Sequence, residues 1–106
     1  MDIFAQAVVK VVLMHPGLFR ERIREIVRER ERVRRSLGEL AYPSDANFLL
    51  VKADAHSFLL ERGGIVVRKL SGGRLRGGHI RVTIGRRREN DAFLKAMEEW
   101  KDVAGL

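Results

Sequence analysis

Two arginines of this 106-residue chain have the type and spacing needed to bind an anion. Arg68 and Arg81 each lie in a segment expected to be a β-strand, and the glycine-rich stretch 71–78 separates them. A guanidinium group offers five N–H donors in a planar fork that matches phosphate or carboxylate oxygens. If the two strands are neighbours, both forks can reach one anion. If they are not, the two arginines are ordinary residues on a solvated sheet face.

The charge distribution also indicates an anionic partner. The chain carries a formal net charge of +7, and residues 62–88 contain nine arginines and lysines without a single aspartate or glutamate. A concentrated positive field of this kind attracts phosphates, carboxylates or nucleic acid. The charge therefore predicts binding of an anion but does not select its class.

Other chemistries find little support in the residue types. The chain has no cysteine, which excludes disulfides, thiolate metal sites and thiol catalysis. His15, His56 and His79 lie in separate segments, and no pair has the spacing of metal ligands on a helix. No nucleophile stands with a matching general base. We expect neither a metal site nor hydrolytic chemistry.

The first forty residues are expected to be helical. An apolar stretch, 5–14, ends at His15-Pro16-Gly17, because proline disfavours helix at the preceding residue. A second helix is predicted from residue 16 or 17 to Leu37, with Gly38 as its stop. Its apolar positions follow a heptad seam in which Arg30 fills one slot.

The solvent-facing side of this second helix is expected to carry offset opposite charges. Glu29 and Arg32 are three residues apart, a spacing at which helical side chains can pair. The pattern predicts an amphipathic helix lying on a sheet, with a short dimeric coiled coil as the alternative.

Strands and a short helix are predicted next. The apolar run 47–51 has the composition of a strand, and the β-branched run 65–68 predicts a second. Between them, Asp54 is a suitable cap for a helix over 55–62, which Gly63-Gly64 would end.

The C-terminal third predicts a strand followed by a helix. The stretch 71–78 is expected to be a loop, and 79–84 alternates apolar and polar residues as a half-buried strand does. Asn90 is a suitable cap for a last helix, whose apolar side chains have helical spacing: Phe93, Leu94, Met97, Trp100 and Val103.

Together these elements predict one α/β domain over residues 1–106, a two-layer α+β fold. The order is helix, helix, strand, helix, strand, strand, helix, and a sheet of about three strands would pack against helices mainly on one face. No apolar run is long enough to cross a bilayer, and no signal peptide is recognisable. We therefore expect a cytoplasmic protein.

Three short motifs in order resemble the end of a known enzyme family. They are Pro43-Ser44-Asp45-Ala46-Asn47-Phe48, Gly64-Ile65-Val66-Val67-Arg68, and Ile80-Arg81-Val82-Thr83-Ile84-Gly85 followed by Glu89-Asn90. From about residue 3 to residue 100 the chain resembles the C-terminal small domain of the histidinol-phosphate aminotransferases. These are transferases of histidine biosynthesis that depend on pyridoxal phosphate, and the resemblance implies an aminotransferase small-domain fold.

The resemblance also implies roles for individual residues. In the family, the arginine matching Arg81 binds the acidic group of the substrate, and the one matching Arg68 helps to hold the substrate phosphate. Asn47 lies in the most diagnostic motif, where its side chain is a candidate for supporting the residues that contact the substrate; a structural role at the start of the strand is an equal alternative.

What the chain lacks limits its expected chemistry. The large domain of such enzymes supplies the Schiff-base lysine, an acid for the pyridinium nitrogen and a phosphate cup. None of the five lysines lies in a motif resembling the attachment segment. We expect that this chain alone binds no pyridoxal phosphate and does not catalyse transamination. Its expected partner is an aminotransferase large domain, or another copy through Phe4, Val8 and Val12.

Two alternatives remain open at this point. One is a nucleic-acid-binding module using residues 62–88, although no Phe, Tyr or Trp lies between Phe58 and Phe93 to stack on bases. The other is the small domain of a threonine-phosphate decarboxylase, a group that shares the Asn-Phe and paired-arginine patterns.

Overall fold

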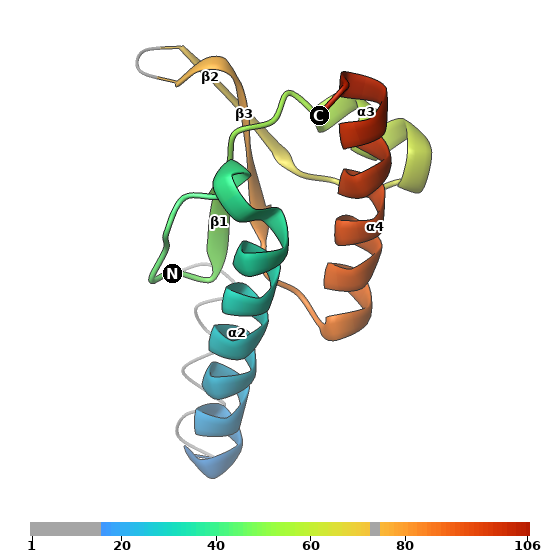
Figure 1. Ribbon diagram of the computed structural model, residues 1–106. Helices are drawn as coiled ribbons and strands as arrows, with labels where there is room; N and C mark the ends of the chain where they lie inside the picture. Colours follow the sequence, from blue (N-terminus) through green and yellow to red (C-terminus); the bar gives the residue numbers. More distant parts are fainter. Residues whose placement is uncertain (1–15, 73–74) are drawn as a thin grey trace.

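A computed structural model describes residues 16–72 and 75–106 of the chain (Figure 1). Its described part contains three α-helices, a short 3-10 turn and an antiparallel sheet of three strands, which confirms the predicted fold class. The predicted helix over 5–14, with Phe4, Val8 and Val12, lies outside the described residues. In chain order the elements are α2 (Pro16–Leu37), η1 (Gly38–Leu40), β1 (Phe48–Val51), α3 (His56–Gly63), β2 (Arg68–Gly72), β3 (Leu75–Thr83) and α4 (Arg87–Ala104).

The sheet has the strand order β1-β3-β2, and both pairs are antiparallel. Leu49 of β1 lies opposite Val82 of β3, and Val51 lies opposite Ile80. All four side chains are buried on one face of the sheet, in a core shared with α2 and α4. Because side chains alternate along a strand, the residues between them point to the other face.

The second half of α2 supplies the helical side of this core. Val33 and Leu37 are buried, whereas Ile23 is 44% exposed because the N-terminal half of the helix projects beyond the sheet (Figure 1). The helix ends where predicted, at Gly38, whose φ of +60° favours glycine. The seam predicted an amphipathic helix lying on a sheet, and Ile26, Val33 and Leu37 of the seam do pack in or against the core, whereas Ile23 does not.

The short helix α3 does not use the cap that we predicted. Its N-cap is Ala55, with no hydrogen bond from its side chain, so Asp54 is not the cap. Asp54 lies instead against Gly78, where an added Cβ would come within 2.6 Å of the Asp54 Cβ. At its other end α3 stops at Gly64, which has a φ of +62°.

The strand predicted over 65–68 and the loop predicted over 71–78 were both largely wrong. The second strand begins only at Arg68, and β2 and β3 pair as a hairpin through most of the predicted loop. Val67 is buried in the core although it lies outside the strand. The β-branched side chain of Val67 thus reflects its burial in the core and not membership of a strand. The hairpin itself is held by main-chain hydrogen bonds, which depend little on the type of side chain.

Helix α4 begins earlier than predicted. Its N-cap is Arg86, and Glu89 Oε1 accepts a hydrogen bond from the Arg86 N–H at 3.2 Å. Asn90 is thus not the cap but lies within the first turn. At the other end, Val103 is 70% exposed and does not extend the core as its spacing predicted.

Candidate anion-binding site

Arg68 and Arg81 are direct cross-strand partners. Arg68 of β2 lies opposite Arg81 of β3, so the two predicted strands are neighbours. Residues paired in this way project from the same face, with Cβ atoms about 5 Å apart. On its other side Arg81 lies opposite Leu50 of β1, so this row crosses the whole sheet. The face is the one opposite the buried core.

The pairing places two positive charges side by side without a compensating acid. Like charges directly opposite each other destabilise a sheet. Within residues 16–72 and 75–106, every ion pair involves other basic residues, and neither Arg68 nor Arg81 takes part in one. An anion bound between the two guanidinium groups would relieve this repulsion and accept their hydrogen bonds.

Aromatic rings accompany the cations on this face. The Arg81 guanidinium carbon lies 5.1 Å from the centre of the Phe48 ring, and Lys52 Nζ lies 4.6 Å from that of Tyr42. Tyr42 stacks on His79, with 3.3 Å between its hydroxyl and Nε2. His79 is buried, and its Nδ1 has no hydrogen-bond partner in the described part of the chain.

The main chain of Asn47 takes part in a hydrogen bond within the fold, whereas its side chain is exposed. The Asn47 carbonyl accepts a hydrogen bond of 2.8 Å from the Ile84 N–H, which ties the start of β1 to the end of β3. This supports the structural alternative for the residue. A contact between its side chain and a substrate stays a prediction.

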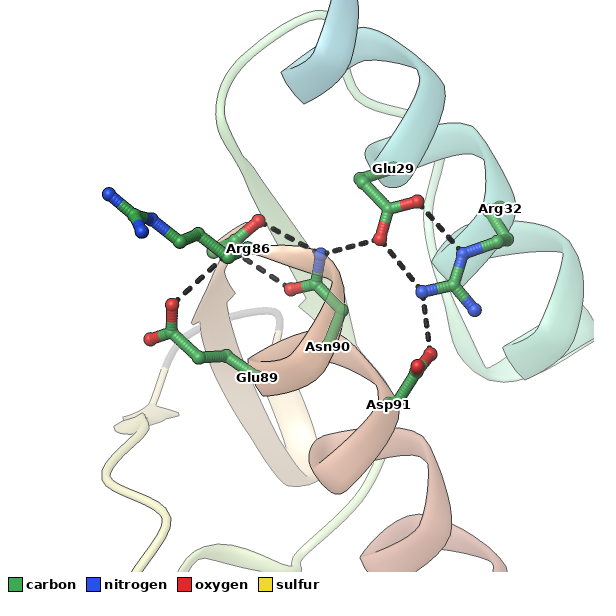
Figure 2. Close-up of polar contacts among 7 residues, drawn as sticks. Glu29, Arg32, Arg86, Glu89, Asn90 and Asp91 are labelled. Atoms are coloured by element: carbon green, nitrogen blue, oxygen red, sulfur yellow. Dashed lines mark hydrogen bonds and ion pairs between the residues drawn. The ribbon is translucent and has the colours of Figure 1, made fainter. Parts of the chain in front are cut away.

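A buried polar network, which no pattern in the sequence predicted, joins α2 to the start of α4 (Figure 2). Asn90 Nδ2 donates to Glu29 Oε1 at 3.0 Å, and Arg32 Nη2 lies 2.7 Å from both Glu29 and Asp91. The Glu29–Arg32 pair was expected on an exposed face, but Glu29 is buried. The spacing predicted the pair; the long-range partner Asn90 left no signal in the sequence.

The same network fixes the turn that leaves β3. The Gly85 N–H donates to Asn90 Oδ1, and Asn90 Nδ2 donates to the Gly85 carbonyl, both at 2.9 Å (Figure 2). The hydrogen bonds from Arg32, reinforced by that from Asn90, outweigh the effect of burial and lower the pKa of Glu29 from 4.5 to about 2. Glu29 is therefore an anion at neutral pH and anchors Asn90.

Other kinds of site find no support among the described residues. Residues 16–72 and 75–106 contain no group of three His, Asp or Glu side chains that could hold a metal ion. The lysines described there, Lys52, Lys69, Lys95 and Lys101, are all at least partly exposed. No helix of the same residues has the length and apolar character that a bilayer span requires.

No protein-family profile matches the sequence. Two curated relatives match almost all of it, and both are named histidinol-phosphate aminotransferase. The one from Thermococcus kodakarensis is 94% identical over 105 residues, which are 99% of this chain and 30% of the relative. The one from Thermococcus gammatolerans is 64% identical over 107 residues, 98% of this chain and 31% of the relative.

Two solved structures share the fold over part of their length. A putative aminotransferase from Burkholderia pseudomallei has a TM-score of 0.64 and 36% identity, covering 77% of this chain and 27% of its own. The L-threonine-O-3-phosphate decarboxylase from Porphyromonas gingivalis has a TM-score of 0.58 and 25% identity, covering 88% of this chain and 32% of its own. The chain thus spans about a third, or less, of the length of each of these four proteins.

Proposed function

This chain is homologous to one segment, about 30% of the length, of the histidinol-phosphate aminotransferases, and we propose that it is the substrate-binding small domain of such an enzyme. In this proposal Arg68 and Arg81 hold the phosphate of histidinol phosphate, and the protein acts in histidine biosynthesis in the cytoplasm. The single observation that carries the proposal is the direct pairing of the two arginines on adjacent strands.

The geometry favours a doubly charged anion over a singly charged one. Each guanidinium can offer two parallel N–H groups, so two of them match two edges of a phosphate. A phosphate also brings up to two negative charges to a face where the two cations repel each other. The preference for a phosphorylated substrate follows from both properties.

The described residues fit a substrate-binding role better than a cofactor-binding one. Aminotransferases in general use pyridoxal phosphate, which forms its Schiff base with a lysine in the active site. The described lysines are partly or fully exposed, and Lys101 lies 3.5 Å from Glu98. We propose that the attachment lysine belongs to the part of the enzyme outside this homologous segment.

An enzyme exchange tests the proposal. In the Thermococcus kodakarensis aminotransferase, the matching 105 residues are replaced by this chain; their 94% identity means that few side chains change. We call the product the exchange enzyme. Transamination of histidinol phosphate with a 2-oxo acid then gives KM and kcat. We expect Arg81→Ala and Arg68→Ala each to raise KM about 10- to 100-fold, because each removes charge-assisted hydrogen bonds.

Arg62→Ala is the matched control. Arg62 is an exposed arginine at the end of α3, where it stacks on Phe58 at 5.3 Å, and it should leave KM within about twofold. Unchanged KM values in both the Arg68 and Arg81 variants would contradict the proposal.

The alternative readings have weaker support. The threonine-phosphate decarboxylase is 25% identical to this chain, against 94% for the aminotransferase of Thermococcus kodakarensis. Nucleic-acid binding would be recognised by salt-sensitive binding of an oligonucleotide that survives Arg81→Ala but is lost when Arg86, Arg87 and Arg88 are replaced.

A further inference from the structure

We propose that Phe48 is a positioning residue, whose ring holds the Arg81 guanidinium group in place for the anion. The inference rests on the proposed function, since Arg81 is the group that would touch the substrate. It concerns a different residue, on a different strand, to which neither the sequence motifs nor the charge pattern assigned a role.

The register of the sheet brings the two side chains together. Phe48 of β1 lies opposite Thr83 of β3, so it is the diagonal neighbour of Arg81 on the same face. The Arg81 guanidinium carbon lies 5.1 Å from the centre of the ring, within the range of a cation–π contact. This contact restricts a long side chain that otherwise has many rotamers.

Arg81 needs such a contact more than an isolated surface arginine does. Arg68 lies directly opposite, and repulsion between the two cations favours conformers of Arg81 that turn away. The face of an aromatic ring is negative and attracts the guanidinium group without occupying the oxygen-binding edge of its fork. Phe48 therefore keeps Arg81 near Arg68 while its donors remain free for an anion.

Phe48 is itself held by the turn that precedes it. Ser44 Oγ donates a hydrogen bond of 2.7 Å to the Phe48 carbonyl and accepts one of 3.0 Å from the Ala46 N–H. The Ser44 hydroxyl group thus ties the Phe48 carbonyl to the turn that precedes the strand. Because the main chain is held and the side chain has only two torsions, the Phe48 ring has few available rotamers.

A buried arginine braces this turn from the helix layer. Arg30 of α2 donates from Nη1 to the Ala46 carbonyl at 3.3 Å, although only 8% of Arg30 is exposed. Charged residues are rarely buried so deeply without an acidic partner. Arg30 is the one polar residue in the heptad seam of α2. Its hydrogen bond gives this residue a role there, because it links α2 to the segment that carries Phe48.

The exchange enzyme tests the role of the ring directly. We expect Phe48→Leu to raise the KM for histidinol phosphate about three- to tenfold and to change kcat less than about twofold, because the loss is in ground-state binding. Phe48→Tyr keeps the ring and should stay within about twofold of the parent. Phe58→Leu is the matched control: it removes the ring beside Arg62, at 5.3 Å, and should leave KM unchanged.

A double-mutant cycle separates positioning from general packing. In the Arg81→Ala background, Phe48→Leu should add less than about twofold to KM, because there is no guanidinium left to position. If Phe48→Leu fails to fold, Phe48→Met replaces it, since methionine fills the space without a ring. An equal effect of Phe48→Leu with and without Arg81, or no effect on KM, overturns the inference. If Arg81→Ala alone leaves KM unchanged, the proposed function fails and this inference with it.

Discussion

At the scale of single residues, two groups of charged side chains differ in whether they have partners within the protein. Arg68 and Arg81 face each other with no acid bound to either in the described residues. Glu29, by contrast, is buried with bonds to Arg32 and Asn90. The first arrangement suits binding of an external anion. The second is internally satisfied and serves the fold.

The state of Glu29 predicts a dependence of stability on pH. Its pKa is lowered from 4.5 to about 2 in the folded protein, so it stabilises the fold above pH 4.5 and this contribution is lost as the pH falls towards 2. We expect Glu29→Gln to lower the free energy of unfolding by roughly 2 kcal/mol at pH 7 and by much less near pH 2.5. Denaturant unfolding at several pH values measures this.

Glu61→Gln is the control for that series, because Glu61 is exposed on α3. It should leave both the stability and its pH dependence within about 0.5 kcal/mol of the parent. A constant difference between the parent and Glu29→Gln from pH 7 to pH 2.5 would show that ionisation of Glu29 does not stabilise the fold.

The glycine at the middle of β3 gives a second residue-scale prediction. Gly78 has a φ of +83°, and an added Cβ would lie 2.6 Å from the Asp54 Cβ and 3.2 Å from its Cα. We expect Gly78→Ala to lower the free energy of unfolding by about 2 to 3 kcal/mol, from backbone strain and overlap together. Gly17→Ala, near the start of α2 with nothing within 4 Å, should be neutral or slightly stabilising. Equal thermal midpoints for the two variants would contradict this account.

At the scale of elements, the sequence predicted those helix ends that are marked by residues at the ends themselves. Helix α2 begins at Pro16 and ends before Gly38, as both residues indicate in the sequence itself. Strand β2 was misplaced because a strand is defined by its partner, and the pairing of Arg68 with Arg81 spans thirteen positions of chain. Asn90 was taken for a cap for the same reason: its partner Glu29 lies 61 residues away.

Asn90 joins three elements, and its removal should loosen all of them. It makes one hydrogen bond to Glu29 of α2 and two to Gly85 in the turn between β3 and α4. We expect Asn90→Ala to lower the free energy of unfolding by about 2 to 4 kcal/mol, because buried groups lose their partners. Amide exchange at Gly85 should also become faster, since its N–H loses its acceptor.

Asp91→Ala is the neighbouring control. Asp91 also pairs with Arg32, but its side chain is 54% exposed, so its loss should cost less than about 1 kcal/mol. Stability losses of the same size for the two variants would mean that Asn90 does not have the linking role assigned to it.

At the scale of the whole molecule, one face of the sheet builds the core and the other presents the arginines. The alternation of apolar and polar residues in β3 predicted this division, with Arg81 on the face opposite Ile80 and Val82. The opposition of Arg68 to Arg81 at the same register level could not be predicted, because a shift of one residue would have sent the two side chains to opposite faces.

Self-association remains a prediction at this scale. Ile23 on the projecting half of α2 is 44% exposed, and Val27, one turn further along the same side of the helix, is 39% exposed. Exposed apolar clusters favour association with another copy or with the rest of an enzyme. We expect light scattering after size exclusion at micromolar concentration to give a mass above the 12.1 kDa of one chain, and Ile23→Glu to lower it. A clean monomer would contradict this.

The central claim, that Arg68 and Arg81 together bind the substrate phosphate, is tested most directly by the preference for a phosphorylated substrate. The kcat/KM of the exchange enzyme is measured for histidinol phosphate and for histidinol, which lacks the phosphate, in the parent and in the Arg68→Ala Arg81→Ala variant. We expect the ratio of the two values to fall at least about 100-fold in the variant, with little change for histidinol itself. An unchanged ratio would contradict the claim.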